Sequence, residues 1–539
     1  MITGKWRRVG GAALLLLIAG SVVAPGAVYA TPSSHPSGGL PLGPASLVET
    51  RTDEQLQPGV TLTRIVRGAA DPAHVWTVEF NIPAGGTSPD PDAPPAALSD
   101  RADAEVLAGR VHAAGFEPRV EPVTAPPTAD YVPGLLGWRV RVGRETTRAG
   151  ADALLIRLVA AGFAGASRFT GWDGADTDRG PWRLQVLTID PRRFTGRLVA
   201  SYGPDLERRE TTSTLSAAAM ATAGVNAGYF VLDPASGAPG DPAGAGVYGG
   251  RLLSETVNTR PALLLREDAR GTDVERLRWR GTISGRAGSL RLDGLNRVPG
   301  LIRNCGGLED EPTTRPLHDF TCVDDGELVA FTPQYGWSTP TGPGVEAVLD
   351  ATSRVVAMRS PRGGALSAGQ RSVQATGDQV DDLRAVAVLR QRLQVTTRLL
   401  GRGDRVVRPT AATSIVNGGP VLVRNGRLRV TPQRDGFVRP TSPSFYYGFS
   451  AARNPRTFAG VDARGRTLLV TADGRSTASL GLSITETGAV AQALGMVEGM
   501  NLDGGGSTTL VVGGRVANAP SDATGERPVG DALLVLPRR

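Results

Sequence analysis

The residues best suited to chemistry lie in one short turn near the C-terminus, Asp503-Gly504-Gly505-Gly506-Ser507-Thr508. Three consecutive glycines carry no Cβ, so the backbone can take positive φ and bring its N–H groups close to a ligand. A carboxylate precedes the glycines and two hydroxyls follow them. Such a turn could hold an anion and supply a base, or it could be a tight turn in which Asp503 bonds its own backbone.

The segments before this turn must position it, and they contain two further carboxylates. A strand pattern over residues 467–472 ends at Asp473. A helix is predicted from about Ser483 to Leu494, and Ser483 and Glu486 have the spacing of a capping box. Asp473 and Glu486 are therefore candidates for a second catalytic group. Each has a structural alternative, as a turn aspartate and as a capping residue.

An earlier segment, residues 414–426, contains an apolar run, a glycine turn at Asn417-Gly418-Gly419-Pro420, a second apolar run and Asn425-Gly426. Taken alone, this pattern predicts a β-hairpin. Asn417 at the turn could bond the backbone or a ligand.

Composition limits the classes of function. The chain has 539 residues, and its 59 Lys+Arg against 52 Asp+Glu leave a net charge of +7. The arginines are scattered among acids without a dense basic run, so nucleic acid is not expected as a partner. Such a surface would tolerate anionic cell-wall polymers.

Residues 1–30 contain basic residues, a short apolar run and small residues at Val28-Tyr29-Ala30, the pattern of a cleaved signal peptide. We therefore expect a secreted or cell-surface protein without a transmembrane anchor in the mature chain. Cys305 and Cys322, the only cysteines, are then expected to form a disulfide that closes a short loop. The four dispersed histidines give little support to a zinc site or a Ser-His-Asp triad.

Residues 71–175 repeat one pattern twice: a strand with tryptophan, a helix, Ala-Gly-Phe and extended chain. Two such halves predict a small ferredoxin-like (βαβ)2 domain with one sheet and two helices. This arrangement resembles the SPOR domain, whose members bind peptidoglycan glycan strands through the sheet. The preceding residues, 31–70, are predicted to be a linker because they begin rich in Pro, Ser and Gly and lack sustained periodicity.

The last two thirds of the chain carry six motifs in a fixed order. They are Val-Asn-Ala-Gly-Tyr-Phe (225–230), Val-Asn-Gly-Gly-Pro-Val-Leu-Val (416–423), Asn-Pro-Arg-Thr (454–457), Ala-Asp-Gly-Arg (472–475), Asn-Leu-Asp-Gly-Gly-Gly-Ser-Thr-Thr (501–509) and Gly-Glu-Arg-Pro-Val-Gly-Asp-Ala-Leu (525–533). Together they resemble the phosphodiester glycosidase family. The resemblance implies a catalytic domain over residues 181–539, elaborated at about 281–401, of the α+β class with a mixed sheet.

The resemblance further implies hydrolysis of a sugar-1-phosphodiester, such as a GlcNAc-1-phosphodiester, in cell-wall or extracellular glycans. Arginine suits the phosphate oxygens, and a carboxylate suits the oxocarbenium-like transition state. Asp503 is the first candidate for base or nucleophile, with Asp473 and Glu486 competing for the second role. The expected substrate-binding residues are Asn226, Asn417, Arg456, Arg475, Gly504, Gly505, Gly506, Ser507, Thr508 and Arg527.

No cofactor is expected. A divalent cation such as Ca²⁺ stays open, although the regular oxygen-ligand spacing of an EF-hand loop is missing. Peptidoglycan is a further possible partner through the N-terminal domain. The alternative function is a cell-wall glycan-binding surface protein that has the same fold without turnover.

Overall fold

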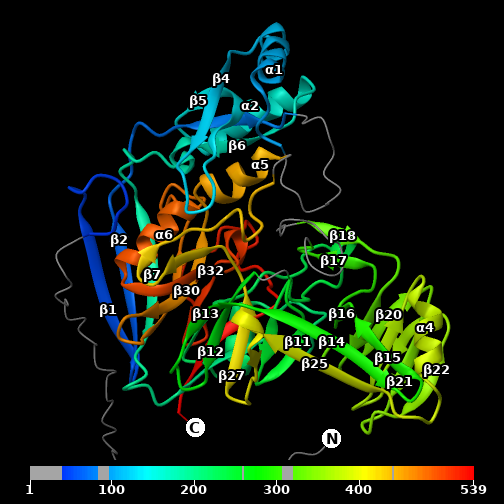
Figure 1. Ribbon diagram of the computed structural model, residues 1–539. Helices are drawn as coiled ribbons and strands as arrows, with labels where there is room; N and C mark the ends of the chain where they lie inside the picture. Colours follow the sequence, from blue (N-terminus) through cyan, green and yellow to red (C-terminus); the bar gives the residue numbers. More distant parts are fainter. Residues whose placement is uncertain (1–38, 83–95, 258–259, 306–319, 440–441, 539) are drawn as a thin grey trace, which may run out of the picture.

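The computed structural model describes residues 39–82, 96–257, 260–305, 320–439 and 442–538. The predicted signal peptide lies outside these residues. Among the residues that are described, none of the helices has the length and apolar character needed to cross a membrane. The mixture of sheets with few helices confirms the predicted α+β class (Figure 1).

An eight-stranded sheet forms the centre of the molecule, and every neighbouring pair in it is antiparallel. In spatial order its strands are β1 (Glu49–Gln57), β2 (Val60–Arg67), β7 (Trp182–Ile189), β31 (Thr467–Ala472), β30 (Arg456–Asp462), β32 (Met496–Asn501), β28 (Val421–Arg424) and β29 (Arg427–Leu428). On one face α6 (Ile484–Ala493) packs through Ile484, Val490 and Ala491. The predicted capping box of Ser483 and Glu486 is confirmed at its start.

Two five-stranded antiparallel sheets contribute to the core on the other face of the central sheet. One contains β34 (Arg515–Val516), β33 (Leu510–Val512), β9 (Ala223–Asn226), β35 (Ala532–Leu536) and β8 (Arg197–Ser201), with α3 (Thr212–Ala218) beside it. The other contains β11 (Arg251–Ser254), β10 (Gly246–Tyr248), β27 (Thr413–Asn417), β12 (Pro261–Arg266) and β13 (Asp273–Arg276). Their apolar residues and those of the central strands make one continuous core.

The middle of the chain adds further strands, most of them at the lower right of Figure 1, around a second core that it shares with β10, β12 and β27. Its four-stranded sheet is β15 (Gly288–Leu292), β14 (Arg278–Gly285), β25 (Gln394–Leu400) and β26 (Val406–Val407). Its five-stranded sheet is β16 (Gly294–Leu295), β19 (Leu328–Phe331), β24 (Arg371–Ala375), β21 (Val345–Leu349) and β22 (Val355–Arg359), with α4 (Gln379–Val386) alongside. Two strand pairs complete it: β17 (Leu301–Arg303) with β18 (Thr321–Val323), and β20 (Ser338–Gly342) with β23 (Arg362–Ala365).

The two-halved repeat forms a separate domain at the top of Figure 1. Its order is β3 (Trp76–Phe80), α1 (Arg101–Ala113), β4 (Pro118–Ala125), β5 (Gly134–Glu145), α2 (Arg148–Ala160) and β6 (Gly165–Phe169). The sheet order β4-β5-β3-β6 and the two helices are those of the predicted ferredoxin-like fold. Apolar side chains of the helices and of one sheet face form its core.

The predicted linker over residues 31–70 is wrong for its second half. Residues 49–67 form the hairpin β1–β2, and β2 pairs with β7 of the central sheet. The (βαβ)2 domain is therefore inserted between two adjacent strands of that sheet. The hairpin escapes detection because β1 is a polar outer strand without an apolar period, and because the buried apolar residues of β2 change from one face at Leu62 to the other at Ile65.

The hairpin predicted over residues 414–426 is only partly correct. Asn425-Gly426 does join the antiparallel pair β28–β29. However, β27 pairs with β10 and β12, whereas β28 pairs with β32 in the central sheet. The Gly418-Gly419-Pro420 segment thus carries the chain from one sheet to another, which a local pattern cannot distinguish from a hairpin turn.

The sheet face of the inserted domain that carries no helix is buried against the rest of the protein. Arg141, which is 1% exposed, donates to Glu79 at 2.7 and 2.9 Å and to Asp173 at 2.6 and 2.8 Å. Tyr447, in the π-helical turn Tyr447–Ala451 after α5 (Pro443–Tyr446), donates to Glu79 at 2.9 Å. Burial alone would raise the pKa of Glu79, but the guanidinium groups of Arg168 and Arg141 hold it below its usual value.

This network predicts a large stability effect for Arg141→Met. The variant leaves Glu79 without its bidentate partner, and breaking a buried ion pair from one side costs about 3 kcal/mol or more. Urea unfolding of the intact chain measures this decrease in the free energy of unfolding. The matched control is Arg101→Met, which removes an exposed pair with Glu105 and should change stability by less than about 1 kcal/mol. Equal effects for the two variants would contradict the structural role of the network.

Candidate active site

A cavity of about 360 Å³ lies at the C-terminal end of β32, within the range of about 300–1,000 Å³ that is usual for small-molecule sites. It contains one carboxylate, Asp503, and four arginines among its described lining residues. The lining residues are Tyr229, Phe230, Leu232, Arg303, Asn304, Phe445, Gly448, Phe449, Asn454, Arg456, Arg475, Asp503, Gly504, Gly505, Gly506, Ser507 and Arg527.

The central sheet fixes the backbone of Asp503. β32 lies between β30 and β28, and Leu502 N donates to Thr457 O at 2.8 Å as the strand ends. Asp503 N then donates to Ala227 O at 2.9 Å, and Asn226 Nδ2 donates to Asp503 O at 2.7 Å. The carboxylate is thus placed at the cavity by bonds from two separate sheets.

Burial raises the pKa of the Asp503 carboxyl to about 6. Arg527 and the N–H of Gly504, which donates to Oδ1 at 2.9 Å, act in the opposite direction. Ser507 lies close enough to lower this pKa too, although its hydroxyl makes no well-formed hydrogen bond within the described part of the chain. A carboxyl group with this pKa can exchange a proton near neutral pH.

The three glycines allow close packing around the turn. Gly505 has φ +59°, and a Cβ on Gly506 would lie 2.2 Å from both Arg527 Nη2 and Asp522 Oδ1. The four backbone N–H groups from Gly504 to Ser507 were expected to bind phosphate, but this expectation is wrong for three of them. Gly504, Gly505 and Ser507 donate instead to Asp503 Oδ1, Pro455 O and Gly504 O.

Arg456, at the start of β30, is only 1% exposed and makes no ion pair among the described residues. Its Nε donates to Leu482 O at 3.0 Å and its Nη2 to Phe449 O, so the side chain is held in one orientation. Burial lowers its pKa to about 10. The guanidinium therefore stays charged at neutral pH, and no carboxylate among the described residues contacts it directly, which suits an anionic ligand.

Two further arginines approach the glycine turn. Arg475 donates to Asn454 Oδ1 at 3.0 and 3.2 Å and is exposed where the cavity opens. Arg527 makes a bidentate pair with Asp522 at 2.7 and 3.1 Å. Asp522 also acts on Arg475, but the four lining arginines outnumber Asp503 and Asp522 together, so the surroundings of the cavity keep an excess of positive charge.

Aromatic rings form another wall of the cavity. Phe449 stacks on Phe437 with ring centroids 4.7 Å apart, and the ring of Phe445 is nearly parallel to that of Phe449. Tyr229 donates its hydroxyl to Gly419 O at 2.7 Å and accepts from Asn501 Nδ2 at 2.9 Å. Fixed aromatic faces of this kind suit the C–H faces of a sugar ring.

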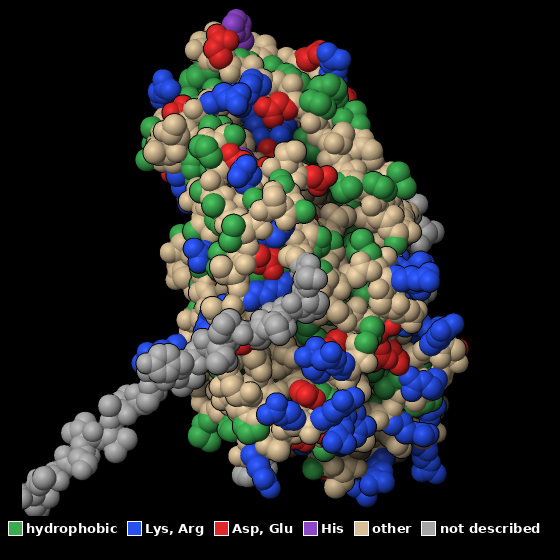
Figure 2. Space-filling model, turned by 90° about the vertical axis from the view of Figure 1, so that its left-hand side faces the viewer, with side chains coloured by type: hydrophobic (Ala, Val, Ile, Leu, Met, Phe, Trp, Pro, Cys, Tyr) green, Lys and Arg blue, Asp and Glu red, His purple; other side chains and the backbone are tan. Residues whose placement is uncertain are grey.

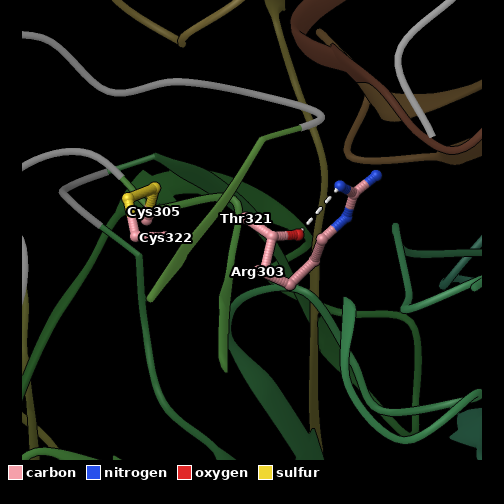
Figure 3. The surroundings of a disulfide bond; sticks show 4 residues. All are labelled: Arg303, Cys305, Thr321 and Cys322. Carbon is pink, nitrogen blue, oxygen red and sulfur yellow. Dashed lines mark hydrogen bonds between the residues drawn. A yellow bond between two sulfur atoms is a disulfide. The ribbon is translucent and has the colours of Figure 1, made fainter. Parts of the chain in front are cut away.

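The predicted disulfide between Cys305 and Cys322 is present and closes the β17–β18 pair. Arg303 lies two residues before Cys305, and its Nη1 donates to Thr321 Oγ1 at 3.3 Å (Figure 3). Its side chain extends away from the sulfur atoms. The crosslink thus stabilises the hairpin that brings Arg303 and Asn304 to the cavity.

Three predicted substrate-binding residues do not line the cavity. Asn226 Oδ1 accepts from Thr457 Oγ1 at 2.6 Å and from Thr509 N at 3.1 Å. Asn417 bonds both backbone groups of Tyr229, at 2.9 and 3.1 Å. Thr508 is buried beneath the turn. The two asparagines are supports for the site rather than ligand contacts.

The two competing carboxylates also lie outside the lining. Asp473 accepts from Gln185, Asn518 and Ala519 N, each at 3.1 Å. Glu486 completes the capping box and makes a bidentate pair with Arg453. Both side chains have partners that explain their positions, so neither is assigned a catalytic role.

Several lining residues were missed as candidates. Tyr229 and Asn454 stand inside motifs noted in the sequence, next to residues that were chosen. No motif in the neighbouring sequence identifies Arg303, Phe445 or Phe449 as a site residue. Among the described residues, no group of three or more His, Cys, Asp or Glu side chains is arranged to hold a metal ion.

The fold and the cavity define an α+β protein whose candidate site places four arginines beside one carboxylate among its described lining residues. A model of the phosphodiester glycosidase family matches residues 343–536, the part that supplies Asp503, the glycine turn, Arg456, Arg475 and Arg527. A model of the SPOR domain matches residues 96–168. Residues 343–536 are thus similar to the phosphodiester glycosidase family, and residues 96–168 are similar to the SPOR domain.

Individual proteins are also similar to this chain in sequence or in structure. The crystal structure of a Burkholderia pseudomallei protein classed as exported is 35% identical, with a TM-score of 0.83, and the match covers 94% of this chain and 99% of that one. A hypothetical protein from Synechocystis shares the fold, with 18% identity and a TM-score of 0.51 over 90% of this chain and 76% of that one. Mouse N-acetylglucosamine-1-phosphodiester alpha-N-acetylglucosaminidase is 32% identical over 109 residues, 20% of this chain and 21% of the mouse protein. The chain spans between 21% and 38% of the length of the mammalian relatives it matches.

Proposed function

We propose that the protein is an exported hydrolase of sugar-1-phosphodiesters, with GlcNAc-1-phosphodiesters of cell-wall or extracellular glycans as the substrate class. The observation that carries the proposal is the placement of a single lining carboxylate, Asp503, among four lining arginines. The arginines suit the phosphodiester anion, and the aromatic wall suits the sugar. The disulfide and the exported relative support an extracellular site of action.

In this reaction the bond between the anomeric carbon and the phosphate oxygen breaks, and its electron pair leaves with the phosphate. Water supplies the new hydroxyl of the sugar. Asp503 either takes the proton of that water or first forms a glycosyl ester that water hydrolyses. A phosphate monoester is a good leaving group, so a second carboxylate is not needed to protonate it.

The inserted SPOR domain is the candidate for holding the enzyme near a glycan. The part of its sheet around Glu79 and Arg141 is buried against Tyr447. A bound glycan would therefore need another surface of this domain. On the face drawn in Figure 2, basic and acidic side chains are interspersed, and the basic ones gather toward its lower part.

The test is release of free sugar from UDP-GlcNAc and from an aryl phosphodiester of α-GlcNAc. A neutral aryl α-GlcNAc glycoside without phosphate is the matched substrate control. We expect kcat/KM for the phosphodiester to exceed that for the neutral glycoside by at least about 30-fold, because charge-assisted hydrogen bonds are worth about 2 kcal/mol. Equal rates would contradict the proposal, and saturable binding without turnover would favour the glycan-binding alternative.

A further inference from the structure

Arg260, just before β12, is a buried cation without a visible partner. The side chain is 8% exposed, and Nε, Nη1 and Nη2 make no hydrogen bond within the described part of the chain. Its pKa is lowered to about 9, chiefly by burial. A buried arginine normally has a carboxylate or several acceptors, because burying an unpaired charge is strongly unfavourable.

The nearby acid does not provide this compensation. Asp435 is the carboxylate whose charge acts on Arg260. Its Oδ1 is bonded by Arg276, and its Oδ2 accepts from Thr431 Oγ1 at 2.7 Å and from Val421 N at 3.0 Å. The guanidinium of Arg260 is therefore left without a direct acceptor among the described residues.

A small cavity lies directly against Arg260. Its volume is about 10 Å³, enough for the centre of one particle the size of a water molecule. A monatomic anion is the charged ligand that needs the least space there. A water molecule would fit but would leave the positive charge uncompensated. Tyr229 and Asn304 line this cavity and also the larger one that contains Asp503.

We infer that Arg260 binds a monatomic halide anion, chloride in physiological media, in this small cavity. The guanidinium fork supplies the hydrogen bonds, and the anion supplies the missing charge. Because Tyr229 and Asn304 separate the two cavities, the halide stabilises the wall of the candidate active site from behind. The inference concerns binding and does not require that the proposed hydrolase activity be correct.

The experiment follows the Tm of the full chain in sodium gluconate while chloride or bromide replaces gluconate at constant ionic strength. We expect a saturable rise of about 3 °C in the wild type and none in Arg260→Gln. The control is Arg427→Gln on exposed β29, which has the same change in charge and should keep the rise. No rise in the wild type, or the same rise in Arg260→Gln, would overturn the inference.

A second measurement covers the case in which Arg260→Gln does not fold. Wild-type crystals grown in gluconate are soaked in sodium bromide, and the anomalous signal of bromine locates bound halide. We expect a peak within about 3.5 Å of the Arg260 guanidinium, between Tyr229 and Asn304. An anomalous map with no peak there at saturating bromide means that water fills the cavity, and the inference is then incorrect.

Discussion

The Asp503→Asn variant is expected to fold and to lose about 10³-fold or more of kcat on a sugar phosphodiester. Asparagine keeps the shape of the side chain but can act neither as a base nor as a nucleophile, and loss of such a group typically removes about 10²–10⁴-fold. Among the described lining residues no other carboxylate can replace it. Single-turnover and steady-state sugar release measure the loss.

The matched control is Asp473→Asn, which makes the same chemical change outside the cavity. This variant weakens three hydrogen bonds and should lower Tm, while kcat of the folded enzyme stays within a few-fold of wild type. If folded Asp473→Asn lost as much kcat as Asp503→Asn, the assignment of Asp503 would be wrong.

The pKa of Asp503, raised to about 6, predicts that both activity and stability depend on pH. Activity that needs the carboxylate rises with pH and levels off above about 6. In unfolded chains aspartate titrates near 3.9, so ionisation of Asp503 opposes folding. The contribution of Asp503 to the stability of the folded state is complete below about pH 4, where the carboxyl is neutral. This contribution is lost as pH rises through about 6. Asp503→Asn should therefore gain Tm relative to wild type at pH 7.5 but not at pH 4.

Arg456→Met should weaken binding of a sugar 1-phosphate by about 10²-fold, since up to two charge-assisted hydrogen bonds to the anion are lost. The arginine also bonds Leu482 O and Phe449 O, so the variant will have a lower Tm. Calorimetric binding of the unphosphorylated sugar is the internal control, and it should change little.

Arg456→Lys separates charge from geometry. Lysine keeps the positive charge but lacks the planar fork, so it should recover only part of the affinity for the sugar phosphate. If Arg456→Met weakened the neutral sugar as much as the sugar phosphate, the arginine would be a structural support and not a phosphate ligand.

The resemblance to the phosphodiester glycosidase family predicted Arg456, Arg475, Arg527 and the segment from Asp503 to Ser507 as site residues, and all of them line the cavity. Asn226 and Asn417 were expected there too, but an amide beside a glycine turn has the same local pattern whether it bonds a ligand or another strand. The role of such an amide depends on contacts between segments that are far apart in the sequence, such as the contact of Asn417 with Tyr229. The spacing of residues along the chain gives no information about these contacts.

The same distinction holds for the fold. The (βαβ)2 domain was predicted because one pattern of strand, helix, Ala-Gly-Phe and extended chain occurs twice, and apolar residues of these elements do enter a common core. The β1–β2 hairpin was missed because its outer strand is polar. The turn at Gly418-Gly419-Pro420 was misinterpreted because a change of sheet and a hairpin use the same residues.

Because the SPOR domain is inserted between β2 and β7, a short turn could replace the whole domain without a change in the central sheet. Arg67 and Trp182, where the chain leaves and re-enters the central sheet, are paired across adjacent antiparallel strands, so their Cα atoms lie about 5 Å apart. A two-residue turn can span that gap. A protein of this fold with such a turn and one with the whole domain can therefore share every hydrogen bond between β2 and β7. A chain without the domain would have to replace the contacts that Tyr447 makes with Arg139 and Glu79.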